Sequence, residues 1–544
     1  MSKPVIRFCL NGRWIEETAV ASDMTVLRYL RTQQSLPGTK EGCGSGDCGA
    51  CSVLLGECSL DDAGNGQWQY QAINGCITFI AQLDGKSLIT VDALSSKKTT
   101  KGLAKEKIPS QLHPAQQAMV DYHGSQCGFC TPGIVMSLAA LHENQRINKN
   151  SEPADHHQII DALSGNLCRC TGYRPIIEAA ENMGNYENNS TDVGQVGIWQ
   201  PKVQLVAESM TKAEVGLVSS SSSADIESQS WSPKTEDELK SLLAQYPEAR
   251  MVAGATDIAL EVTQMNRRIP QLIAINDIAS LKTITIEDDS ILIGAAVTYS
   301  QMEATLNEYF PEFGQLMHRF ASRQVRNNGT MGGNVANASP IGDTPPVLLA
   351  LGACIELASR EGNRWMPLHE FFLDYKKTQQ KQGEYLRMIR IPRLKENQHL
   401  KVYKISKRLE DDISAVLAAF KFTLADGKHG QAGSQIVTAV SSGFGGMAGI
   451  PKAATQLEQA LLNKEISMEN FEQAALVLDQ DFAPMTDVRA TSEYRLQVAQ
   501  NLVQKCAFEL ANPDSITRIE ALEKSELSLA QVTAKEVLGG EQHA

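Results

Sequence analysis

Gly42-Cys-Gly-Ser-Gly-Asp-Cys-Gly-Ala-Cys51 is the stretch that decides the character of this chain, because it gathers cysteines and glycines in one short loop. Cys43, Cys48 and Cys51 are separated by four and then two residues, and Cys76 supplies a distant fourth thiol. This is the spacing of plant-type ferredoxins, which hold a [2Fe-2S] cluster. Glycines suit such a loop, since they reach positive φ angles and let backbone N–H groups approach the sulfurs. Zinc is the alternative, but zinc ribbons favour two short cysteine pairs of like spacing.

A second set of cysteines lies in Gln126-Cys-Gly-Phe-Cys-Thr-Pro-Gly133 and in Asn166-Leu-Cys-Arg-Cys-Thr-Gly-Tyr-Arg-Pro175. The four thiols are those of Cys127, Cys130, Cys168 and Cys170. Both pairs are predicted at helix ends, so that two helical hairpins present four thiolates to one point. By spacing alone, such a set suits zinc as well as an iron–sulfur cluster.

Two residues near these thiols carry local predictions. Thr131 is expected to cap a helix that begins at Pro132, where a missing N–H costs nothing. Gly165 follows a helix predicted to end near Leu163, at a place that favours a left-handed conformation. His156 and His157, in a polar insertion at 146–157, are interpreted as a solvated helix start rather than as metal ligands.

Composition narrows the class of protein. The 544 residues are too many for one ordinary core, and 42% hydrophobic with 21% charged residues is typical of a globular protein. No apolar run approaches the roughly 18 residues of a membrane span, and the N-terminus lacks the features of a signal peptide, so we expect a cytoplasmic protein and no membrane. The formal charge of -13 argues against nucleic acid as a partner.

The pattern of apolar and turn residues predicts several domains. We expect a hairpin at 5–16, a helix at 25–32, extended segments at 52–55 and 70–78, and helices at 114–122, 132–143, 155–163 and 175–182. Later elements are a helix at 236–245, strands at 250–253, 272–275, 291–293 and 437–441, and helices at 451–462 and 491–510. The predicted units are 1–88, 89–185, a linker at 186–229, 230–425, 426–530 and a tail at 531–544.

Two segments in the third unit suit a dinucleotide. Residues 250–258 predict a strand, a tight turn and a helix start, which bring backbone N–H groups toward a phosphate. Residues 328–343 combine paired glycines, small hydroxyls and one carboxylate, which suit a pyrophosphate beside a polyol. Neither segment contains the Rossmann GxGxxG pattern.

Taken together, these motifs closely resemble the xanthine dehydrogenase and aldehyde oxidase family of molybdenum hydroxylases, and all eight cysteines match position for position. The resemblance implies an α+β multidomain fold: a β-grasp [2Fe-2S] ferredoxin domain, a four-helix [2Fe-2S] domain, an α/β FAD-binding domain of the PCMH type and an α+β flavoprotein C-terminal domain. It also implies that all eight cysteines bind clusters rather than zinc.

The resemblance further assigns residues to the flavin. Those expected to line FAD are Met251, Val252, Ala253, Gly254, Ala255, Thr256, Asp257, Ile258, Phe320, Thr330, Gly332, Gly333, Asn334, Asp343, Leu386 and Lys404. Relatives often have Gly or Asn where this chain has Ala255, so we expect the turn there to avoid a backbone angle that Ala resists. Family segments near the nicotinamide entrance match Tyr375, Arg408, Asp411 and Asp412, although as plain charged runs these residues also suit a solvated loop.

The function implied is electron transfer, as in the small subunits of bacterial members of the family. Electrons would pass from a molybdopterin cofactor in a separate large subunit through two [2Fe-2S] clusters to FAD and then to NAD+, during oxidation of hypoxanthine and xanthine to urate. No segment resembles the molybdopterin domain, so we expect a heterodimer or a dimer of heterodimers and no catalytic residue in this chain. The alternatives are the same role beside an aldehyde- or other N-heterocycle-oxidising partner, and a non-catalytic redox-sensing adaptor.

Overall fold

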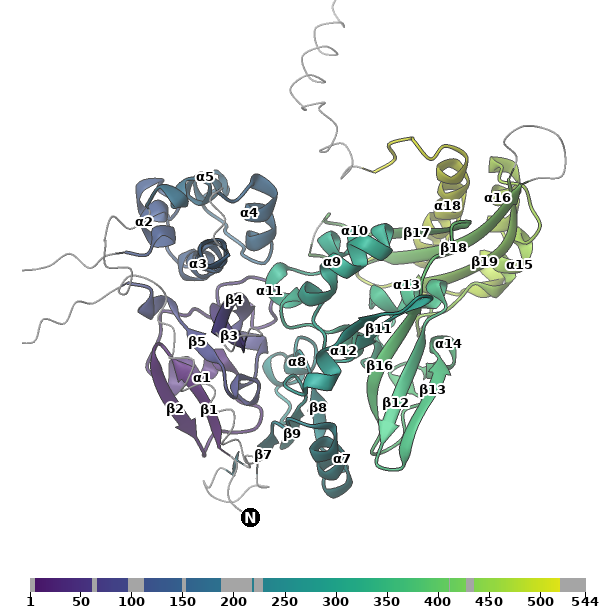
Figure 1. Ribbon diagram of the computed structural model, residues 1–544. Coiled ribbons are helices and arrows are strands. Elements are labelled where there is room, and N and C mark those ends of the chain that lie inside the picture. The colour runs from purple at the N-terminus through teal and green to yellow at the C-terminus, as the bar shows by residue number, and fades with distance from the viewer. Residues whose placement is uncertain are drawn as a thin grey trace, which may run out of the picture.

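The computed structural model describes residues 5–60, 66–95, 112–148, 153–186, 218–219, 228–409, 411–426 and 435–518. Most of the predicted linker, part of the predicted insertion and the whole predicted tail lie outside these ranges. In the part of the chain that is described, no helix is both long and apolar enough to cross a membrane. Figure 1 shows a small sheet and a group of helices on one side and a larger body of strands and helices on the other.

The N-terminal unit is a five-stranded sheet with the strand order β2-β1-β5-β3-β4. Its elements are β1 (Ile6–Leu10), β2 (Arg13–Glu17), α1 (Val26–Thr32), β3 (Ser52–Leu60), β4 (Gly66–Asn74) and β5 (Ser87–Ile89). The predicted hairpin and helix are confirmed. Asn11 and Gly12, between β1 and β2, both have positive φ, which a tight hairpin turn requires. The hydroxyl of Thr25 accepts a hydrogen bond from the N–H of Arg28 and caps α1.

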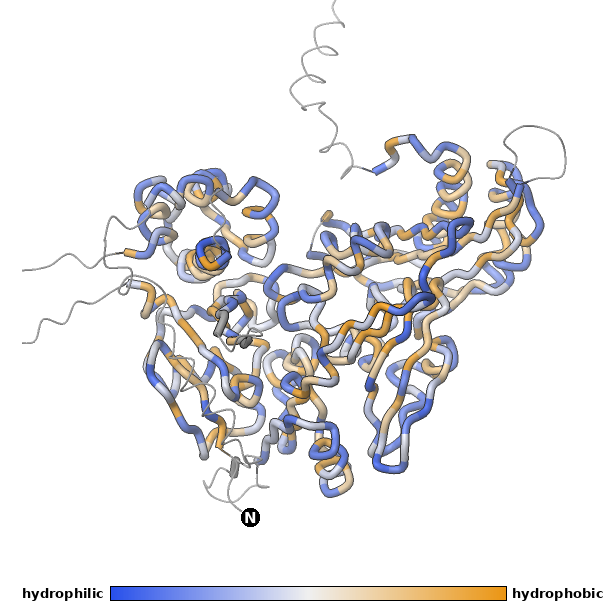
Figure 2. The backbone as a smooth tube through the Cα atoms, viewed as in Figure 1, coloured by the Kyte–Doolittle hydropathy of each residue, from blue (hydrophilic) through white to orange (hydrophobic). Residues whose placement is uncertain are grey.

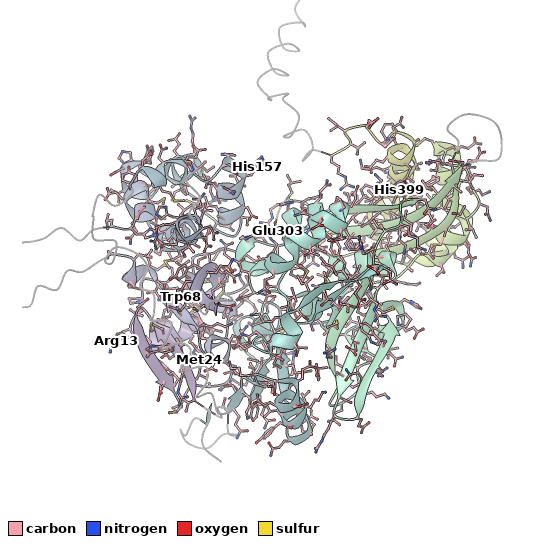
Figure 3. The ribbon with its side chains drawn as sticks, viewed as in Figure 1. Arg13, Met24, Trp68, His157, Glu303 and His399 are labelled. Atoms are coloured by element: carbon pink, nitrogen blue, oxygen red, sulfur yellow. The ribbon has the colours of Figure 1, made fainter. Side chains whose placement is uncertain are left out.

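Four helices form the second unit, as the apolar periodicity predicts. They are α2 (Pro114–Asp121), α3 (Thr131–Ile147), α4 (His156–Leu163) and α5 (Arg174–Asn182). Their apolar faces share one core with the first sheet, in which Leu54 and Trp68 from β3 and β4 join Ile134 and Leu138 from α3. Figure 3 labels Trp68 where the sheet meets the helices. The two cysteine-bearing units are therefore packed against one another.

The third unit contains two larger sheets and a two-stranded sheet, β14 (Phe372–Asp374) with β15 (Lys377–Thr378). The first, in the order β6-β7-β9-β8, comprises β6 (Val218–Ser219), β7 (Gln229–Trp231), β8 (Arg250–Val252) and β9 (Gln271–Ala274), with α7 (Glu236–Gln245) and α8 (Ile258–Thr263). The second, in the order β10-β11-β16-β12-β13, comprises β10 (Ile284–Ile286), β11 (Ser290–Gly294), β12 (Cys354–Ser359), β13 (Gly362–Pro367) and β16 (Tyr385–Pro392). The other elements are α9 (Tyr299–Tyr309), α10 (Pro311–Arg319), α11 (Arg323–Arg326), α12 (Met331–Ala336), α13 (Thr344–Leu351) and α14 (Leu368–Phe371).

The last unit is a three-stranded antiparallel sheet covered by helices. Its elements are β17 (Gln398–Ile405), β18 (Val416–Asp426), β19 (Gln435–Gly445), α15 (Thr455–Leu461), α16 (Met468–Ala475), α17 (Leu478–Asp481) and α18 (Ser492–Ala511). This sheet joins residues on both sides of the predicted boundary at 425–426. Apolar residues run along the strands of the large body, whereas the loops at its rim are hydrophilic (Figure 2). The whole has the predicted α+β multidomain fold.

A network of ion pairs joins the first sheet to the third unit. Lys86 lies 2.8 Å from Glu57 and 3.2 Å from Asp277, and Lys234 lies 3.1 Å from both Asp84 and Asp277. Because Lys86 and Asp277 are largely shielded from water, losing one partner would leave a poorly solvated charge. The network therefore ties the first sheet to the third unit.

Candidate functional site

The first cysteine loop lies between α1 and β3, and Cys76 comes from the short 3-10 helix η1 (Gly75–Ile77) after β4. The backbone N–H groups of Ser45 and Cys48 donate to the sulfur of Cys43 at 3.3 and 3.4 Å, and the N–H of Cys43 donates to the sulfur of Cys48 at 3.3 Å. The predicted approach of backbone N–H groups to the sulfurs is confirmed.

Glycine conformation explains this geometry. Gly44, Gly46 and Gly49 have φ angles of 67°, 86° and 65°, as predicted for a loop that wraps around a group. Gly42 serves differently: a Cβ atom there would lie 2.6 Å from the Cys48 sulfur. The loop therefore needs glycine both for its backbone angles and for the space beside a thiol.

The four thiols of this group interact in a row, Cys48 with Cys43, Cys43 with Cys76 and Cys76 with Cys51. Hydrogen bonding from Cys48, and then from Cys76, lowers the pKa of the Cys43 thiol, while hydrogen bonding with Cys43 and Cys51 raises the pKa of Cys76. Four neighbouring thiols with N–H donors around them fit a binuclear cluster, in which each iron takes two thiolates.

The second group has an outer and an inner pair of thiols. The sulfurs of Cys127 and Cys170 are 3.6 Å apart and both residues are exposed, whereas Cys130 and Cys168 are buried. Burial raises the pKa of Cys130 to about 12. Burial also acts on Cys168, but hydrogen bonds from Thr171 outweigh it and hold the pKa of Cys168 at about 7. Two predicted helical hairpins do bring these four thiols together.

Both local predictions beside this group were wrong. Helix α3 begins at Thr131 rather than at Pro132, Cys130 occupies the cap position, and the Thr131 hydroxyl donates to Ser125 instead of capping. Gly165 does not have a positive φ. A Cβ atom at Gly165 would lie 2.3 Å from the side-chain oxygen of Gln324, so glycine is required there by a close approach between units.

The two cysteine loops touch through their backbones. The N–H of Leu167, which precedes Cys168, donates to the carbonyl oxygen of Cys48 at 3.0 Å. A Cβ atom at Gly49 would lie 2.1 Å from the oxygen of Gly165, and one at Gly133 would lie 2.0 Å from the oxygen of Gly49. Glycine at positions 49 and 133 thus leaves room for the close approach of the two groups.

The first cysteine group also meets the dinucleotide segments. The side chain of Gln264, at the end of α8, donates to the carbonyl oxygen of Cys43 at 3.1 Å. Thr78, two residues after Cys76, accepts from the side chain of Asn328 at 2.9 Å. Gln82 donates to the carbonyl oxygen of Ala253 at 2.9 Å. The three predicted sites therefore follow one another, with the first cysteine group in the middle.

The two dinucleotide segments lie against each other. A Cβ atom at Gly254 would lie 2.1 Å from the oxygen of Asn328, and one at Gly332 would lie 2.5 Å from the Cα atom of Ala295. The Thr330 hydroxyl accepts from the N–H of Gly333, and the Asn334 side chain accepts from Thr344 at 2.8 Å. This cradle of small residues, hydroxyls and amides fits a pyrophosphate and a polyol.

The prediction for Ala255 was wrong. Ala255 has a φ of 64°, in the left-handed region that the turn was expected to avoid, and it is buried. Its carbonyl oxygen accepts the hydrogen bond from Ala259 that starts α8. A left-handed angle costs a non-glycine residue about 1 kcal/mol or more, so the surrounding packing must hold this strain.

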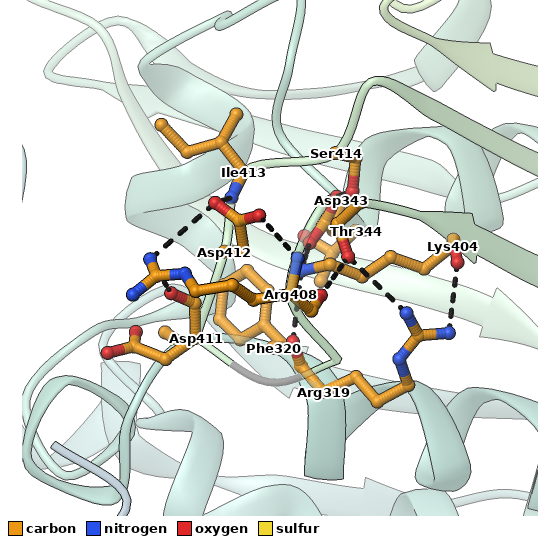
Figure 4. Close-up of polar contacts among 12 residues, drawn as sticks. Arg319, Phe320, Asp343, Thr344, Lys404, Arg408, Asp411, Asp412, Ile413 and Ser414 are labelled. Atoms are coloured by element: carbon orange, nitrogen blue, oxygen red, sulfur yellow. Dashed lines mark hydrogen bonds and ion pairs between the residues drawn. The ribbon is translucent and has the colours of Figure 1, made fainter. Parts of the chain in front are cut away.

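Asp343 lies at the centre of a buried polar group (Figure 4). One carboxylate oxygen accepts from the Lys404 ammonium at 2.8 Å and the other from the Ser414 hydroxyl at 2.5 Å. Lys404 also donates to the carbonyl oxygen of Arg319. Each carboxylate oxygen accepts one hydrogen bond from the described residues and has two acceptor positions. The structure thus brings together two of the predicted flavin residues, Asp343 and Lys404.

The remaining predicted flavin residues lie in several elements. Phe320 packs on the ring of Tyr299, with 4.6 Å between the ring centroids, and Leu386 is buried in β16. The others run from β8 through the turn into the start of α8, and they are Met251, Val252, Ala253, Thr256, Asp257 and Ile258. Their roles toward a flavin stay predictions.

The nicotinamide-side candidates fall in two places. Tyr375 is exposed at the turn between β14 and β15. Arg408, Asp411 and Asp412 lie in the loop after β17, where Arg408 donates to the carbonyl oxygen of Asp411 and pairs with Asp412. Burial, and then the nearby carboxylate of Asp47, raise the pKa of Asp411 to about 6. Among the described residues, no hydrogen bond joins Tyr375 to this loop.

Sequence reasoning missed two polar residues of the flavin region. Thr344 follows Asp343 directly in sequence, so its place in the flavin region could have been predicted from that neighbour. Ser414 follows Asp343 by 71 residues and lies in a loop with no motif, so only the fold brings it to that carboxylate.

Comparisons with known families agree with this arrangement. Four family models match: "2Fe-2S iron-sulfur cluster binding domain" over residues 8–81, "[2Fe-2S] binding domain" over 99–181, "FAD binding domain in molybdopterin dehydrogenase" over 225–394, and "CO dehydrogenase flavoprotein C-terminal domain" over 401–510. The chain thus has two [2Fe-2S] domains and one FAD-binding domain.

Curated relatives point to the same family. Xanthine dehydrogenase of Drosophila subobscura is 32% identical over 523 residues, which cover 87% of this chain and 36% of that protein. Xanthine dehydrogenase/oxidase of Gallus gallus is 32% identical over 501 residues, covering 81% of this chain and 35% of that protein. The chain thus spans about a third of the length of these relatives. A solved structure, reconstituted CO dehydrogenase from Oligotropha carboxidovorans, aligns with a TM-score of 0.48 at 26% identity over 52% of this chain and 97% of that chain.

Eight thiols in two touching groups lie next to a cradle of small polar residues, and family models for two [2Fe-2S] domains, an FAD-binding domain and a flavoprotein C-terminal domain match the chain in that order. This chain belongs to the xanthine dehydrogenase family of molybdenum hydroxylases, of which it forms the iron–sulfur and FAD-binding part.

Proposed function

We propose that this chain is the electron-transfer subunit of a xanthine dehydrogenase. It takes electrons from a separate subunit that holds the molybdenum cofactor and delivers them to NAD+, while the partner oxidises hypoxanthine and xanthine to urate. The assembly would be a heterodimer or a dimer of heterodimers, in the cytoplasm, without nucleic acid or membrane.

The observation that carries this proposal is the order of the three sites. The second cysteine group has two exposed thiols, the first group touches it through the Leu167 to Cys48 hydrogen bond, and the flavin segments contact the first group through Thr78 and Gln264. An exposed group at one end suits docking of a donor, and burial of Cys51 and Cys76 in the first group limits its contact with solvent.

Each cofactor would be held by residues of this chain. Cys43, Cys48, Cys51 and Cys76 would bind one cluster, and Cys127, Cys130, Cys168 and Cys170 the other. FAD would lie along residues 251–258 and 330–334, near Asp343. The flavin is needed because clusters pass single electrons, whereas NAD+ accepts a hydride. This chain supplies position, electrostatics and exclusion of water rather than acid–base groups.

The nicotinamide would approach the Arg408 to Asp412 loop, because that loop lies beside Asp343 and Lys404 in the flavin region (Figure 4). Arg319 ties the two together by donating to the carbonyl oxygens of Lys404 and Leu409 at 2.9 and 3.0 Å. Asp411 and Arg408 offer the polar groups that ribose and phosphate require.

Two other functions are distinguishable. The partner could oxidise an aldehyde or another N-heterocycle, since substrate choice would belong to that subunit. The chain could instead be a redox-sensing adaptor that passes no electrons to a nicotinamide. The curated relatives, which are named xanthine dehydrogenases, favour the xanthine dehydrogenase role over both alternatives.

Oxidation of NADH by the purified chain with an artificial electron acceptor tests the proposal. We expect turnover that is lost in a flavin-depleted sample and restored by added FAD. If the flavin-loaded chain does not oxidise NADH, the proposal is wrong and the redox-sensing adaptor is the remaining function. Recovery of a molybdenum-containing protein with the tagged chain, followed by assay with xanthine and with aldehydes, then assigns the substrate.

A further inference from the structure

A buried network of uncharged polar groups lies where three units of the chain meet. Its centre is Asn166, which is 3% exposed and lies two residues before Cys168. The Asn166 side-chain oxygen accepts from the Ser137 hydroxyl at 2.6 Å and from the Gln324 amide at 3.0 Å. Its nitrogen donates to the carbonyl oxygen of Gly49 at 3.1 Å and to the Ser52 hydroxyl at 3.3 Å.

These four contacts use every hydrogen-bonding position of an asparagine side chain, which has two acceptor and two donor sites. The partners come from all three units: Ser137 is on α3, Gly49 and Ser52 belong to the first cysteine loop and β3, and Gln324 is on α11. Asn166 therefore bonds the two cysteine loops and the flavin-binding unit to one another through a single side chain.

Gln324 is the contribution of the flavin-binding unit. It is 1% exposed, and its nitrogen also lies 2.8 Å from the carbonyl oxygen of Ala162 and 2.9 Å from the hydroxyl of Ser137. Beside it, the Arg323 N–H donates to the Ser164 hydroxyl at 2.9 Å. The Gln324 nitrogen has two hydrogens for the three acceptors around it, and its buried oxygen has no partner among the described residues. Buried polar groups are costly unless they are paired, so the network is held mainly at Asn166, whose side-chain positions are all paired.

We propose that Asn166 is a positioning residue that fixes the Cys168 to Cys170 loop against the Cys48 to Cys51 loop, and that Gln324 locks this arrangement to the flavin-binding unit. The role rests on the proposed function, because spacing between the loops matters only if both hold clusters. The network acts through the loops, since none of its side chains is a thiol.

The test compares full-length chains carrying Asn166→Asp or the control Asn182→Asp. Asn182 is in the same helical unit, but its side-chain nitrogen donates only to Glu178 of its own helix and to no other unit. Hydrogen exchange of the Leu167 amide reports the contact between the loops directly. We expect exchange about tenfold faster in Asn166→Asp, because two donors facing Gly49 and Ser52 are lost, and parental exchange in the control.

A second readout is the magnetic interaction between the two reduced clusters in electron paramagnetic resonance spectra. We expect it to change in Asn166→Asp while iron and flavin content stay at the parental level. Leu167 exchange at the parental rate together with a parental spectrum would overturn the proposal.

If Asn166→Asp does not fold, the variant Gln324→Met provides the test. It removes the hydrogen bonds from the flavin-binding unit to Asn166 and its neighbours. Unchanged Leu167 exchange in Gln324→Met would also overturn the proposal. A parent chain without clusters would refute the proposed function, whereas the exchange data alone would still decide whether Asn166 positions the loops.

Discussion

The N–H of Leu167 and the carbonyl oxygen of Cys48 form a hydrogen bond of 3.0 Å that joins two cysteine loops more than a hundred residues apart in sequence. Glycine at positions 49 and 133 leaves room for that approach, because a Cβ atom there would lie 2.1 and 2.0 Å from a backbone oxygen of the other group. The relationship makes the two thiol groups neighbours whose units share one core, but each group takes its four thiols from its own unit. Changes in one group should therefore leave the other intact.

Cys168→Ser should abolish the second cluster and retain the first cluster and the flavin. Serine is a poor ligand for iron–sulfur clusters, and the first group and the flavin segments have separate scaffolds. Iron should fall from about four to about two atoms per chain, with flavin unchanged. Cys354→Ser, on strand β12 away from both groups, is the control and should keep all of its iron. Loss of flavin together with both clusters would contradict the separation of the sites.

Asp343→Ala should weaken FAD retention and destabilise the fold. The substitution leaves the buried Lys404 ammonium without its carboxylate partner, which costs about 3–5 kcal/mol. The double variant Asp343→Ala with Lys404→Met should recover much of that stability in denaturant unfolding, because the unpaired charge is gone. Flavin content that stays at the parental level in the double variant would remove Asp343 and Lys404 from the flavin site.

Asp411→Asn should stabilise the chain in a pH-dependent way. Burial and Asp47 raise the folded-state pKa of Asp411 from 3.8 to about 6, so the folded state binds its proton more tightly than the unfolded state does. Ionisation of Asp411 therefore costs stability, in full above about pH 6 and not at all below about pH 4. Melting curves should show the variant more stable than the parent at pH 7 and equal to it at pH 3.5. A difference of the same size at both pH values would contradict this.

Gly165→Ala should destabilise the chain by roughly 1–3 kcal/mol, the usual cost of overpacking. The added Cβ atom would lie 2.3 Å from the side-chain oxygen of Gln324 and 2.6 Å from the Cβ atom of Ser322. Gly184→Ala is the matched control, because nothing lies within 4 Å of a Cβ atom there. Equal unfolding midpoints for the two variants would show that the units separate easily at Gly165.

Local patterns predicted the elements but not the contacts between them. The spacing of Cys43, Cys48 and Cys51 identified the first loop, and apolar periodicity located the helices of the second unit, because both signals lie within one short segment. Ala255 was misjudged, since neighbouring packing rather than residue preference sets its φ. Glycine at position 165 was predicted from local helix-end preference, but it is required because the side chain of Gln324, 159 residues away, packs against it.

The polar network could not be predicted for the same reason. Asn166 and Gln324 are separated by 158 residues, and neither stands in a pattern that indicates a partner. Ser414 reaches Asp343 only because β17 and β18 bring their connecting loop over the flavin segments. The sequence therefore predicted candidate ligands and flavin residues. Only the fold revealed the side chains, such as Ser414 and Gln324, that hold them in place.

The most direct test of the central claim is the iron, zinc, acid-labile sulfide and flavin content of the chain purified without oxygen, together with its absorption spectrum. Two [2Fe-2S] clusters and a flavin predict about four iron atoms, four sulfides and one FAD per chain, with no zinc. Zinc in place of iron, without flavin, would contradict electron transfer and leave a metal-stabilised scaffold.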